Sequence, residues 1–206
     1  RGSLIFWNAS MKKKVAIFIS GGGSNMVSLV EKMYNSQFAW PSLVLSNKKN
    51  VSGLEKANAL KIPTICVEPD EVNGFDLRFE SVIQKELLNH SIDIICLAGF
   101  LKVLSKGFVD TWQGNILNIH PSLLPKYKGL HTHERVLKNN EILTGCTVHE
   151  VTHKLDCGRI LGQATVPVLP NDTVQSVKLR VLEKEHVLYP KTLEHFCLGK
   201  SIPVIM

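Results

Sequence analysis

The sequence predicts an α/β fold, in which a doubly wound, mostly parallel sheet carries an antiparallel C-terminal portion. Three observations predict it. In the first half, runs rich in β-branched residues alternate with segments of helical periodicity. Residues 92–97 are apolar nearly throughout. From Gly114 onward the alternation of strand and helix patterns is less regular. A strand without a polar face is typical of a parallel sheet covered by helices on both sides. We therefore expect ligands in the crevice beyond the carboxyl ends of the strands.

Each element of the first half follows from its own pattern. Residues 14–20 form a β-branched run that three glycines end, and the segment after them carries apolar residues at helical spacing. The same reasoning along the chain gives strands at 14–20, 43–46, 64–67 and 92–97, and helices at 25–34, 53–60 and 76–88.

The second half is expected to be less regular. A short strand at 115–119 runs into a segment with two prolines, which forbid continued ladder pairing. A helix follows at 130–137, two strands at 146–152 and 159–168 are linked by a turn at 156–158, and a long amphipathic helix spans 174–189. No repeat or Pro-, Gly- or Ser-rich linker divides the chain, so we expect a single domain at 11–206. Residues 1–10 are interpreted as an N-terminal extension or an expression remnant.

Composition and charge narrow the function classes. The chain has 206 residues, of which 44% are hydrophobic, enough for a sizeable core. Its net charge of +6 includes no run of five or six like charges, which favours small anionic ligands over nucleic acid. The longest uncharged apolar stretch is about half of the ~20 residues that a membrane-spanning helix needs. Residues 4–7 are too few for a signal-peptide core.

The cysteines indicate the redox environment. There are five, with neither a C-x-x-C pair nor a regular spacing, and an odd number fits a disulfide framework poorly. Cys96 lies in an apolar run, where a free cysteine usually behaves as a small hydrophobic residue. We therefore expect a reducing cytoplasm and no nucleophilic cysteine.

The glycine-rich turn at 20–25 lies between a strand and the start of a helix. Unpaired backbone N–H groups and the helix dipole attract an anion there. The dinucleotide fingerprint fails because Met26 occupies its third glycine position, and no Gly-Lys-Ser/Thr follows as in a Walker loop. The turn therefore predicts a site for a single phosphomonoester. The alternative is a tight turn that uses glycine for its backbone conformation alone.

Residues 149–153 match the H-E-x-x-H pattern of zinc peptidases. That chemistry needs a helix, so that the two imidazoles meet on one face. The β-branched neighbours instead indicate a strand, on which His149 and His153 share a face but lie too far apart to share a metal ion. The pair His131 and His133 is an equally weak metal motif. We expect no metal site.

Residues 118–125 are the most informative stretch. Asn118 and His120 lie at a strand end with period two, so both side chains point to the same side. Such a pair could polarise a carbonyl and stabilise the oxyanion that forms when an amine attacks it, while the imidazole moves protons. Asp156 could supply the carboxylate that orients and charges the histidine. The alternative is purely local, with Asn118 and Asp156 as backbone or turn partners and His120 packed at a strand end.

At these residues the sequence closely resembles the phosphoribosylglycinamide formyltransferases of purine biosynthesis. Four blocks carry the resemblance and together span nearly the whole chain from Met11. The third block is the most specific, because its seventeen residues follow the family pattern almost continuously. The blocks are 19–25, 97–104, 117–133, and 145–149 with Leu155, Asp156 and Gly158.

The resemblance implies an enzyme that transfers the formyl group of 10-formyltetrahydrofolate, a cosubstrate, to the amine of phosphoribosylglycinamide on the route to IMP. It implies that Asn118 and His120 bind the formyl oxygen, that His120 donates a proton, and that Asp156 keeps His120 charged. The residues implied for phosphoribosylglycinamide are Gly23, Ser24, Asn25 and Glu185. The residues implied for the folate are Leu97, Leu101, Lys102, Val103, Leu104, Asn118 and Asp156. It also implies small-molecule partners, neither nucleic acid nor membrane, and a cytoplasmic monomer or homodimer.

The sequence departs from the family at several positions. Thr144 stands where the family usually has histidine, and residues 153–154 replace residues that are commonly acidic. Lys102 fills a position often held by arginine, which keeps the charge and loses the bidentate geometry. Arg78 is the arginine nearest to Asp76, where we expect a contact with the glutamate tail of the folate.

Related activities use the same Asn, His and Asp set. Methionyl-tRNA formyltransferase needs a C-terminal RNA-contacting domain, formyltetrahydrofolate deformylase carries an additional N-terminal domain, and sugar-nucleotide formyltransferases share the set as well. We expect neither of the first two enzymes, because the sequence ends soon after the last expected helix and only about a dozen residues precede the first expected strand. Another folate-dependent formyltransferase or hydrolase remains the alternative. A non-catalytic phosphosugar-binding module would use the glycine loop but not three convergent polar groups.

Overall fold

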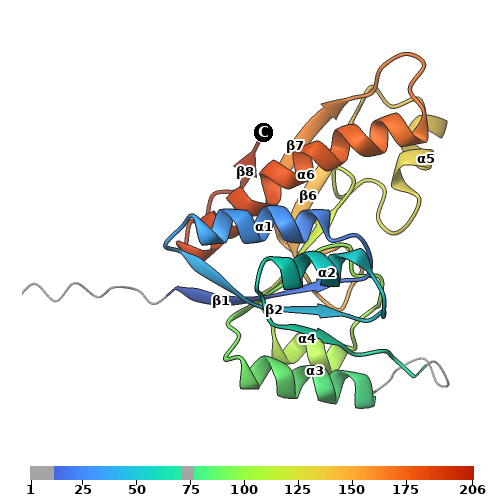
Figure 1. Ribbon diagram of the computed structural model, residues 1–206. Helices are drawn as coiled ribbons and strands as arrows, with labels where there is room; N and C mark the ends of the chain where they lie inside the picture. Colours follow the sequence, from blue (N-terminus) through green and yellow to red (C-terminus); the bar gives the residue numbers. More distant parts are fainter. Residues whose placement is uncertain (1–11, 71–76) are drawn as a thin grey trace, which may run out of the picture.

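The computed structural model describes residues 12–70 and 77–206, and its centre is one sheet (Figure 1). In this part of the chain the sheet has eight strands in the order β3-β2-β1-β4-β5-β6-β7-β8. Neighbours from β3 to β5 pair in parallel, β6 is antiparallel to both β5 and β7, and β8 is parallel to β7. The expected α/β sheet with an antiparallel C-terminal portion is confirmed.

The described residues form the following strands and helices. The strands are β1 (Lys13–Ile19), β2 (Ala39–Ser46), β3 (Thr64–Cys66), β4 (Ile94–Leu97), β5 (Ile116–His120), β6 (Leu143–Glu150), β7 (Ile160–Pro167) and β8 (Val204–Ile205). The helices are α1 (Ser24–Tyr34), α2 (Ser52–Ala59), α3 (Leu77–Asn89), α4 (Lys106–Thr111), α5 (Thr132–Lys138) and α6 (Val174–Cys197).

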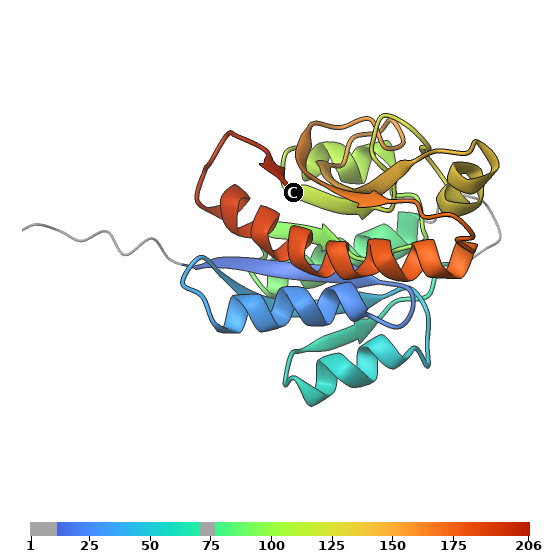
Figure 2. The same cartoon turned by 90° about the horizontal axis from the view of Figure 1, so that it is seen from above.

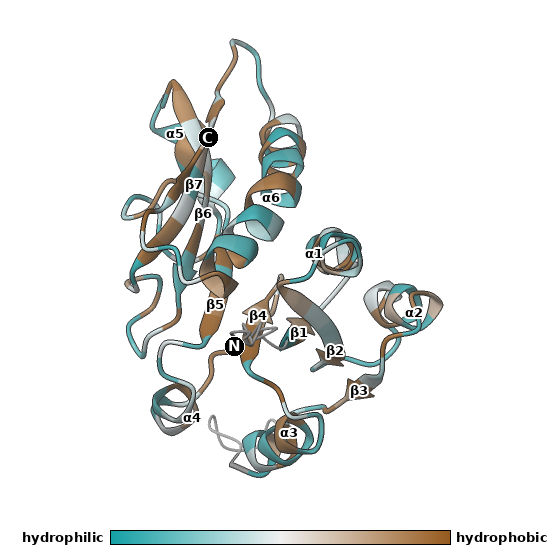
Figure 3. Cartoon of the chain, turned by 90° about the vertical axis from the view of Figure 1, so that its left-hand side faces the viewer, coloured by the Kyte–Doolittle hydropathy of each residue, from teal (hydrophilic) through white to brown (hydrophobic). Residues whose placement is uncertain are grey.

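Helices cover both faces of the sheet (Figure 3). The side chains of β1 alternate between the two faces. Ile17 and its same-face neighbours pack with the buried residues of α1 and α6. Phe18, on the opposite face, packs with the buried residues of α3 and α4. Each face has its own apolar core, which explains why the central strands lack a polar side.

Several elements differ from their predicted bounds. The strand expected at 92–97 begins at Ile94, and the strand expected at 146–152 ends at Glu150, so the link to β7 is a loop longer than the turn at 156–158. Helix α6 continues past Tyr189 and through Pro190 to Cys197, because Leu188, Tyr189 and Leu193 are all buried and their packing outweighs the missing proline donor. Helix α4 and strand β8 are short elements that the periodicity does not predict. Asp76, the expected first residue of α3, lies outside the described residues.

The strand order creates the crevice. The chain builds outward from β1 in one direction to β2 and β3 and in the other to β4 and β5, so the order reverses between β1 and β4. The glycine loop follows β1, and residues 98–104 follow β4, at this same edge. Helices α1 and α6 lie side by side over the adjoining face (Figure 2). Among the described helices, none combines the length and apolar character that a bilayer crossing requires.

Candidate active site

Asn118 and His149 face each other across β5 and β6. The two residues are direct partners in the antiparallel ladder, so their side chains leave the same face of the sheet. Asn118 Nδ2 lies 3.2 Å from His149 Nε2. His149 is buried, and its Nδ1 lies 2.8 Å from the carbonyl of Glu150, which can only accept, so Nδ1 carries the proton. Nε2 is then the acceptor for one N–H of the Asn118 amide, and the other N–H stays available to a ligand.

The environment keeps the His149 ring neutral. Burial is the main cause that lowers the pKa of His149, and the nearby His120 lowers it further, against the raising effects of the Glu150 carbonyl and Asp156. A neutral ring preserves the Nε2 lone pair that orients Asn118. The sequence interpretation placed His149 in a rejected metal motif and in the block at 145–149, but gave it no role in the site. Its period-two position on a strand that pairs with the strand of Asn118 is the signal that could have found it.

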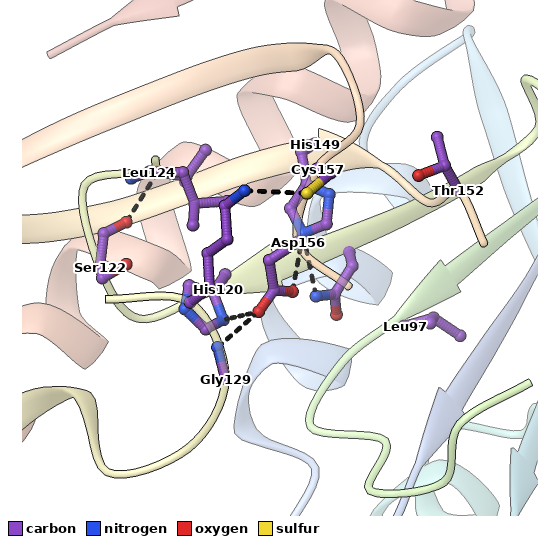
Figure 4. A network of polar contacts seen from close by, with 12 residues as sticks. Leu97, His120, Ser122, Leu124, Gly129, His149, Thr152, Asp156 and Cys157 are labelled. Atoms are coloured by element: carbon purple, nitrogen blue, oxygen red, sulfur yellow. Dashed lines mark hydrogen bonds and ion pairs between the residues drawn. The ribbon is translucent and has the colours of Figure 1, made fainter. Parts of the chain in front are cut away.

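Asp156 lies beside both histidines (Figure 4). Its Oδ2 lies 3.5 Å from His120 Nδ1, and its Oδ1 lies 3.6 Å from His149 Nε2. The Gly129 N–H donates to Oδ2 at 2.8 Å and fixes the carboxylate. Lys128 Nζ donates to Cys157 Sγ at 2.8 Å, a second tie between the same two loops. The structure therefore brings the predicted trio of Asn118, His120 and Asp156 to one place, with His149 between them.

His120 has an acceptor at each ring nitrogen. Its Nε2 lies 2.9 Å from the carbonyl oxygen of Tyr127, and its Nδ1 faces Asp156. Two acceptors suit a ring that carries two N–H groups. The hydrogen bond from Nε2–H to the Tyr127 carbonyl is short, whereas the contact between Nδ1 and Asp156 is long. Hydrogen bonds of catalytic groups are often long before a ligand binds. Nδ1 is thus the nitrogen left to act on a substrate.

The predicted phosphosugar residues meet between α1 and α6. Asn25 Nδ2 donates to Glu185 Oε2 at 2.7 Å, and both side chains are buried. Burial raises the pKa of Glu185 to about 7, and the bond from Asn25 opposes the shift only in part. Asn25 Oδ1 is buried without a hydrogen-bond partner, an acceptor that a ligand donor would satisfy.

Close packing fixes the backbone of the glycine loop at Gly23, whereas a Cβ at Gly21 would meet nothing within 4 Å. Gly23 is the N-cap of α1 and has φ 70°, in the left-handed region. A Cβ at this position would come within 2.9 Å of the Cα of Gly53 in α2. Ser24 follows as the first residue of α1, so its N–H is one of the unpaired donors of the helix start. These unpaired donors are compatible with the anion site that the sequence predicts, and that site stays a prediction.

The predicted folate residues lie on the strand beside Asn118 and on the loop that follows it. Leu97 ends β4 and is the register partner of Asn118 in β5. Leu101 and Val103 are 68% and 74% exposed, whereas Leu104 is buried. Lys102 Nζ lies 5.3 Å from the centre of the Phe79 ring, which holds its charge against α3. Exposed apolar side chains around an open loop backbone suit a flat aromatic ligand.

Nothing in the described residues suggests a metal centre. No group of three or more His, Cys, Asp or Glu side chains in this part of the chain could hold an ion. His149 lies in β6, whereas His153 lies beyond the end of that strand, so the zinc-peptidase helix is absent from the described segment. His131 precedes α5 with φ 57°, and His133 is buried within α5. The donor set of the candidate site is one of hydrogen bonds.

Comparisons with known proteins show which family this chain is similar to. The formyl transferase family model matches residues 13–193. The phosphoribosylglycinamide formyltransferase of Escherichia coli is 37% identical over 90% of this chain and 88% of its own length. That of Haemophilus influenzae is 36% identical over 91% and 89%. The crystal structure of the Brucella melitensis phosphoribosylglycinamide formyltransferase superposes with a TM-score of 0.85, at 44% identity over 94% of this chain and 100% of that one.

Some relatives are much longer than this chain. The chain matches 91% of its own length to the human trifunctional purine biosynthetic protein adenosine-3 at 43% identity, but spans only 19% of that protein. In the corresponding protein of Chironomus tentans it spans 14%. A formyltetrahydrofolate deformylase from Pseudomonas syringae, at 21% identity, shares the fold. By the extent and identity of its matches to the shorter relatives, the chain belongs to the phosphoribosylglycinamide formyltransferases, within the formyl transferase family.

Proposed function

We propose that this protein transfers the formyl group of 10-formyltetrahydrofolate to the amine of 5-phosphoribosylglycinamide in purine (IMP) biosynthesis. The observation that carries the proposal is the meeting of Asn118, His120 and Asp156 at the end of β5, the strand next to β4 at the edge where the glycine loop and the loop after β4 also lie. A candidate oxyanion site therefore shares one edge of the sheet with a candidate phosphate site and an apolar loop. The two substrates of the reaction need such an arrangement.

The amine nitrogen attacks the formyl carbon, and the carbonyl electron pair moves to the oxygen. The free N–H of Asn118 and the Nδ1–H of His120 donate to that oxyanion. When the oxyanion collapses, the bond from carbon to N10 of the folate breaks, the attacking amine loses a proton and N10 gains one. Removing one such donor from an acyl-transfer enzyme typically costs about 2.7–4 kcal/mol of transition-state stabilisation.

Asp156 acts through His120 and through proton transfer. Its carboxylate, held by the Gly129 N–H, lies beside the ring nitrogen that faces the substrate and stabilises the charged ring. The same carboxylate can relay the proton that leaves the amine, directly or through a water molecule. His149 orients Asn118 and acts as a positioning residue.

The remaining residues hold the two ligands. The N–H groups of Gly23 and Ser24 would bind the phosphate at the start of α1. Asn25 and Glu185 would bind the ribose hydroxyls, which supply the donor that Asn25 Oδ1 lacks. Leu97 and residues 101–104 would hold the pterin, with backbone groups bonding the ring between apolar side chains.

These roles need no metal ion, and the proposed partners are the two small molecules. We place the reaction in the cytoplasm, on a monomer or homodimer. The carboxylates of the folate's glutamate tail would need cationic side chains. Lys102 and Arg78 are the nearby cations of the loop after β4 and of α3.

An absorbance assay tests the proposal directly. Purified protein is mixed with 10-formyltetrahydrofolate and phosphoribosylglycinamide, and the appearance of tetrahydrofolate is followed beside formylated product. His120→Ala should abolish turnover, whereas His153→Ala, an exposed histidine of the neighbouring loop, should retain it. Release of formate without formylated product would instead identify a hydrolase. Binding of the phosphosugar without any turnover would identify a binding module.

A further inference from the structure

Ser20 joins the two ligand loops. It follows β1, is the first residue of the glycine loop at 20–25, and is 6% exposed. Its backbone N–H donates to the carbonyl of Gly99 at 3.1 Å. Its Oγ accepts the N–H of Leu101 at 2.8 Å and donates to Asn47 Oδ1 at 2.6 Å. One residue therefore holds the loop after β4 at two points while it is itself the first residue of the phosphate loop.

The bonds of Ser20 form a directed chain. The amide of Leu101 donates, the hydroxyl accepts and donates in turn, and the carbonyl of Asn47 accepts. The hydroxyl proton thus has one defined position, and each bond polarises the next. Asn47 is 7% exposed, so water does not readily replace either partner.

Within the loop at 98–104, Phe100 packs on the Phe18 ring and Leu104 is buried, whereas the backbone around Leu101 is held by these bonds. Leu101 and Val103 point their side chains to solvent, so this part of the loop gains little from burial. A segment with few buried apolar contacts opens locally at low free-energy cost unless its backbone is tied down. Ser20 provides the ties at Gly99 and Leu101.

We propose that Ser20 is a positioning residue that couples the two substrates, so that phosphosugar on the glycine loop tightens folate binding on the loop after β4. The inference rests on the proposed function, because it assigns one ligand to each loop. A ligand that orders the glycine loop fixes Ser20 and thereby lowers the ordering cost of the second loop. The effect is reciprocal, because the coupling free energy belongs to both sites.

The test measures tetrahydrofolate binding by calorimetry with and without phosphoribosylglycinamide. This pair cannot react, because no formyl group is present. In the native protein we expect the phosphosugar to tighten folate binding at least about fivefold, the low end of usual coupling factors. In Ser20→Ala, which leaves the Leu101 amide without its acceptor, the factor should fall to about one.

Ser46→Ala is the matched control. Ser46 ends the neighbouring strand β2 and is fully buried, but its hydroxyl donates to the carbonyl of Lys48 at 2.8 Å and accepts the N–H of Lys48 at 3.1 Å, both within its own turn. This variant should keep the native coupling factor. Ser20→Thr keeps a hydroxyl and should restore coupling. Asn47→Ala, which removes the acceptor of the Ser20 hydroxyl, should lower the factor and supplies a second test where Ser20→Ala does not fold.

The outcomes separate the two proposals. A full coupling factor in Ser20→Ala or Asn47→Ala would overturn the role of Ser20, as would an equal loss in Ser46→Ala. A factor of one in a native protein that binds both ligands and transfers formyl would overturn the coupling alone. A native protein that binds neither ligand would refute the proposed function and this inference with it. Hydrogen exchange at the Leu101 amide is a second measurement of the coupling. Phosphosugar should slow this exchange in the native protein and leave it unchanged in Ser20→Ala.

Discussion

Replacing Asp156 with asparagine isolates the charge of this residue from its shape. The amide oxygen can still accept from Gly129, which donates to Oδ2 at 2.8 Å, so the loop keeps its anchor. What is lost is a negative charge 3.5 Å from His120 Nδ1, between two side chains that are 7% and 6% exposed. We expect a variant that folds normally and binds both substrates, but stabilises the charged imidazole poorly.

The magnitude follows from Coulomb's law. Two unit charges at this separation interact by about 5 kcal/mol at an effective dielectric constant near 20. Water that solvates the imidazole in the variant offsets part of this lost interaction energy. A loss of about 3–4 kcal/mol of transition-state stabilisation corresponds to a fall in kcat of roughly two to three orders of magnitude. KM should change by less than about threefold, because the charge acts mainly in the transition state.

Steady-state formyl transfer with both substrates varied measures these constants. Asp172→Asn is the matched control, since Asp172 is similarly covered and pairs with Arg180 at 2.8 Å in a part of the chain that the mechanism does not use. That variant should lose stability and keep its kcat. An unchanged kcat in Asp156→Asn, or a rise in KM with kcat preserved, would refute the role given to the carboxylate.

Three further predictions concern the neighbouring groups. His149→Phe keeps a ring but removes the acceptor that orients Asn118, and kcat should fall about tenfold in the same assay while His149→Gln retains more of it. Glu185 has its pKa raised from 4.5 to about 7 in the folded protein. The folded state therefore binds this proton more tightly than the unfolded state. The free energy of unfolding should decrease by about 3 kcal/mol as the pH rises from 4.5 to 7. Urea unfolding at several pH values measures this dependence, which should be absent in Glu185→Gln. Gly23→Ala should weaken phosphosugar binding at least tenfold and spare folate binding in calorimetry, because its φ of 70° and its contact with α2 exclude a side chain. Gly21→Ala, where a Cβ meets nothing within 4 Å, should be nearly neutral.

The sequence interpretation was most successful where local pattern is strong. Residues 14–20 and 25–34 appear as β1 and α1 within a residue at each end, because period and glycine punctuation are properties of a short segment. The same holds for Asn118 and His120, whose shared side follows from a strand period of two. The local pattern gave the wrong end for α6 at Pro190, because proline usually ends a helix. Here the burial of the flanking residues lets the helix continue past it.

Long-range pairing explains what the sequence interpretation missed. His149 enters the site because β6 runs antiparallel to β5 in one particular register, and a shift of one residue would turn it to the other face. Short elements such as α4 and β8 have too few residues for a periodic signal. The Ser20 chain joins residues from three strand ends that no local pattern connects.

By itself, the sequence determined the class of sheet, the family of the chain and the chemical types of the groups at the end of β5. Only the tertiary structure decided which nitrogen of His120 is left for the substrate, that His149 is neutral, and that Glu185 holds its proton to an unusually high pH. The physical reason is that period and residue type are set along the chain, whereas burial and hydrogen-bond partners come from elements that meet only when the sheet is assembled.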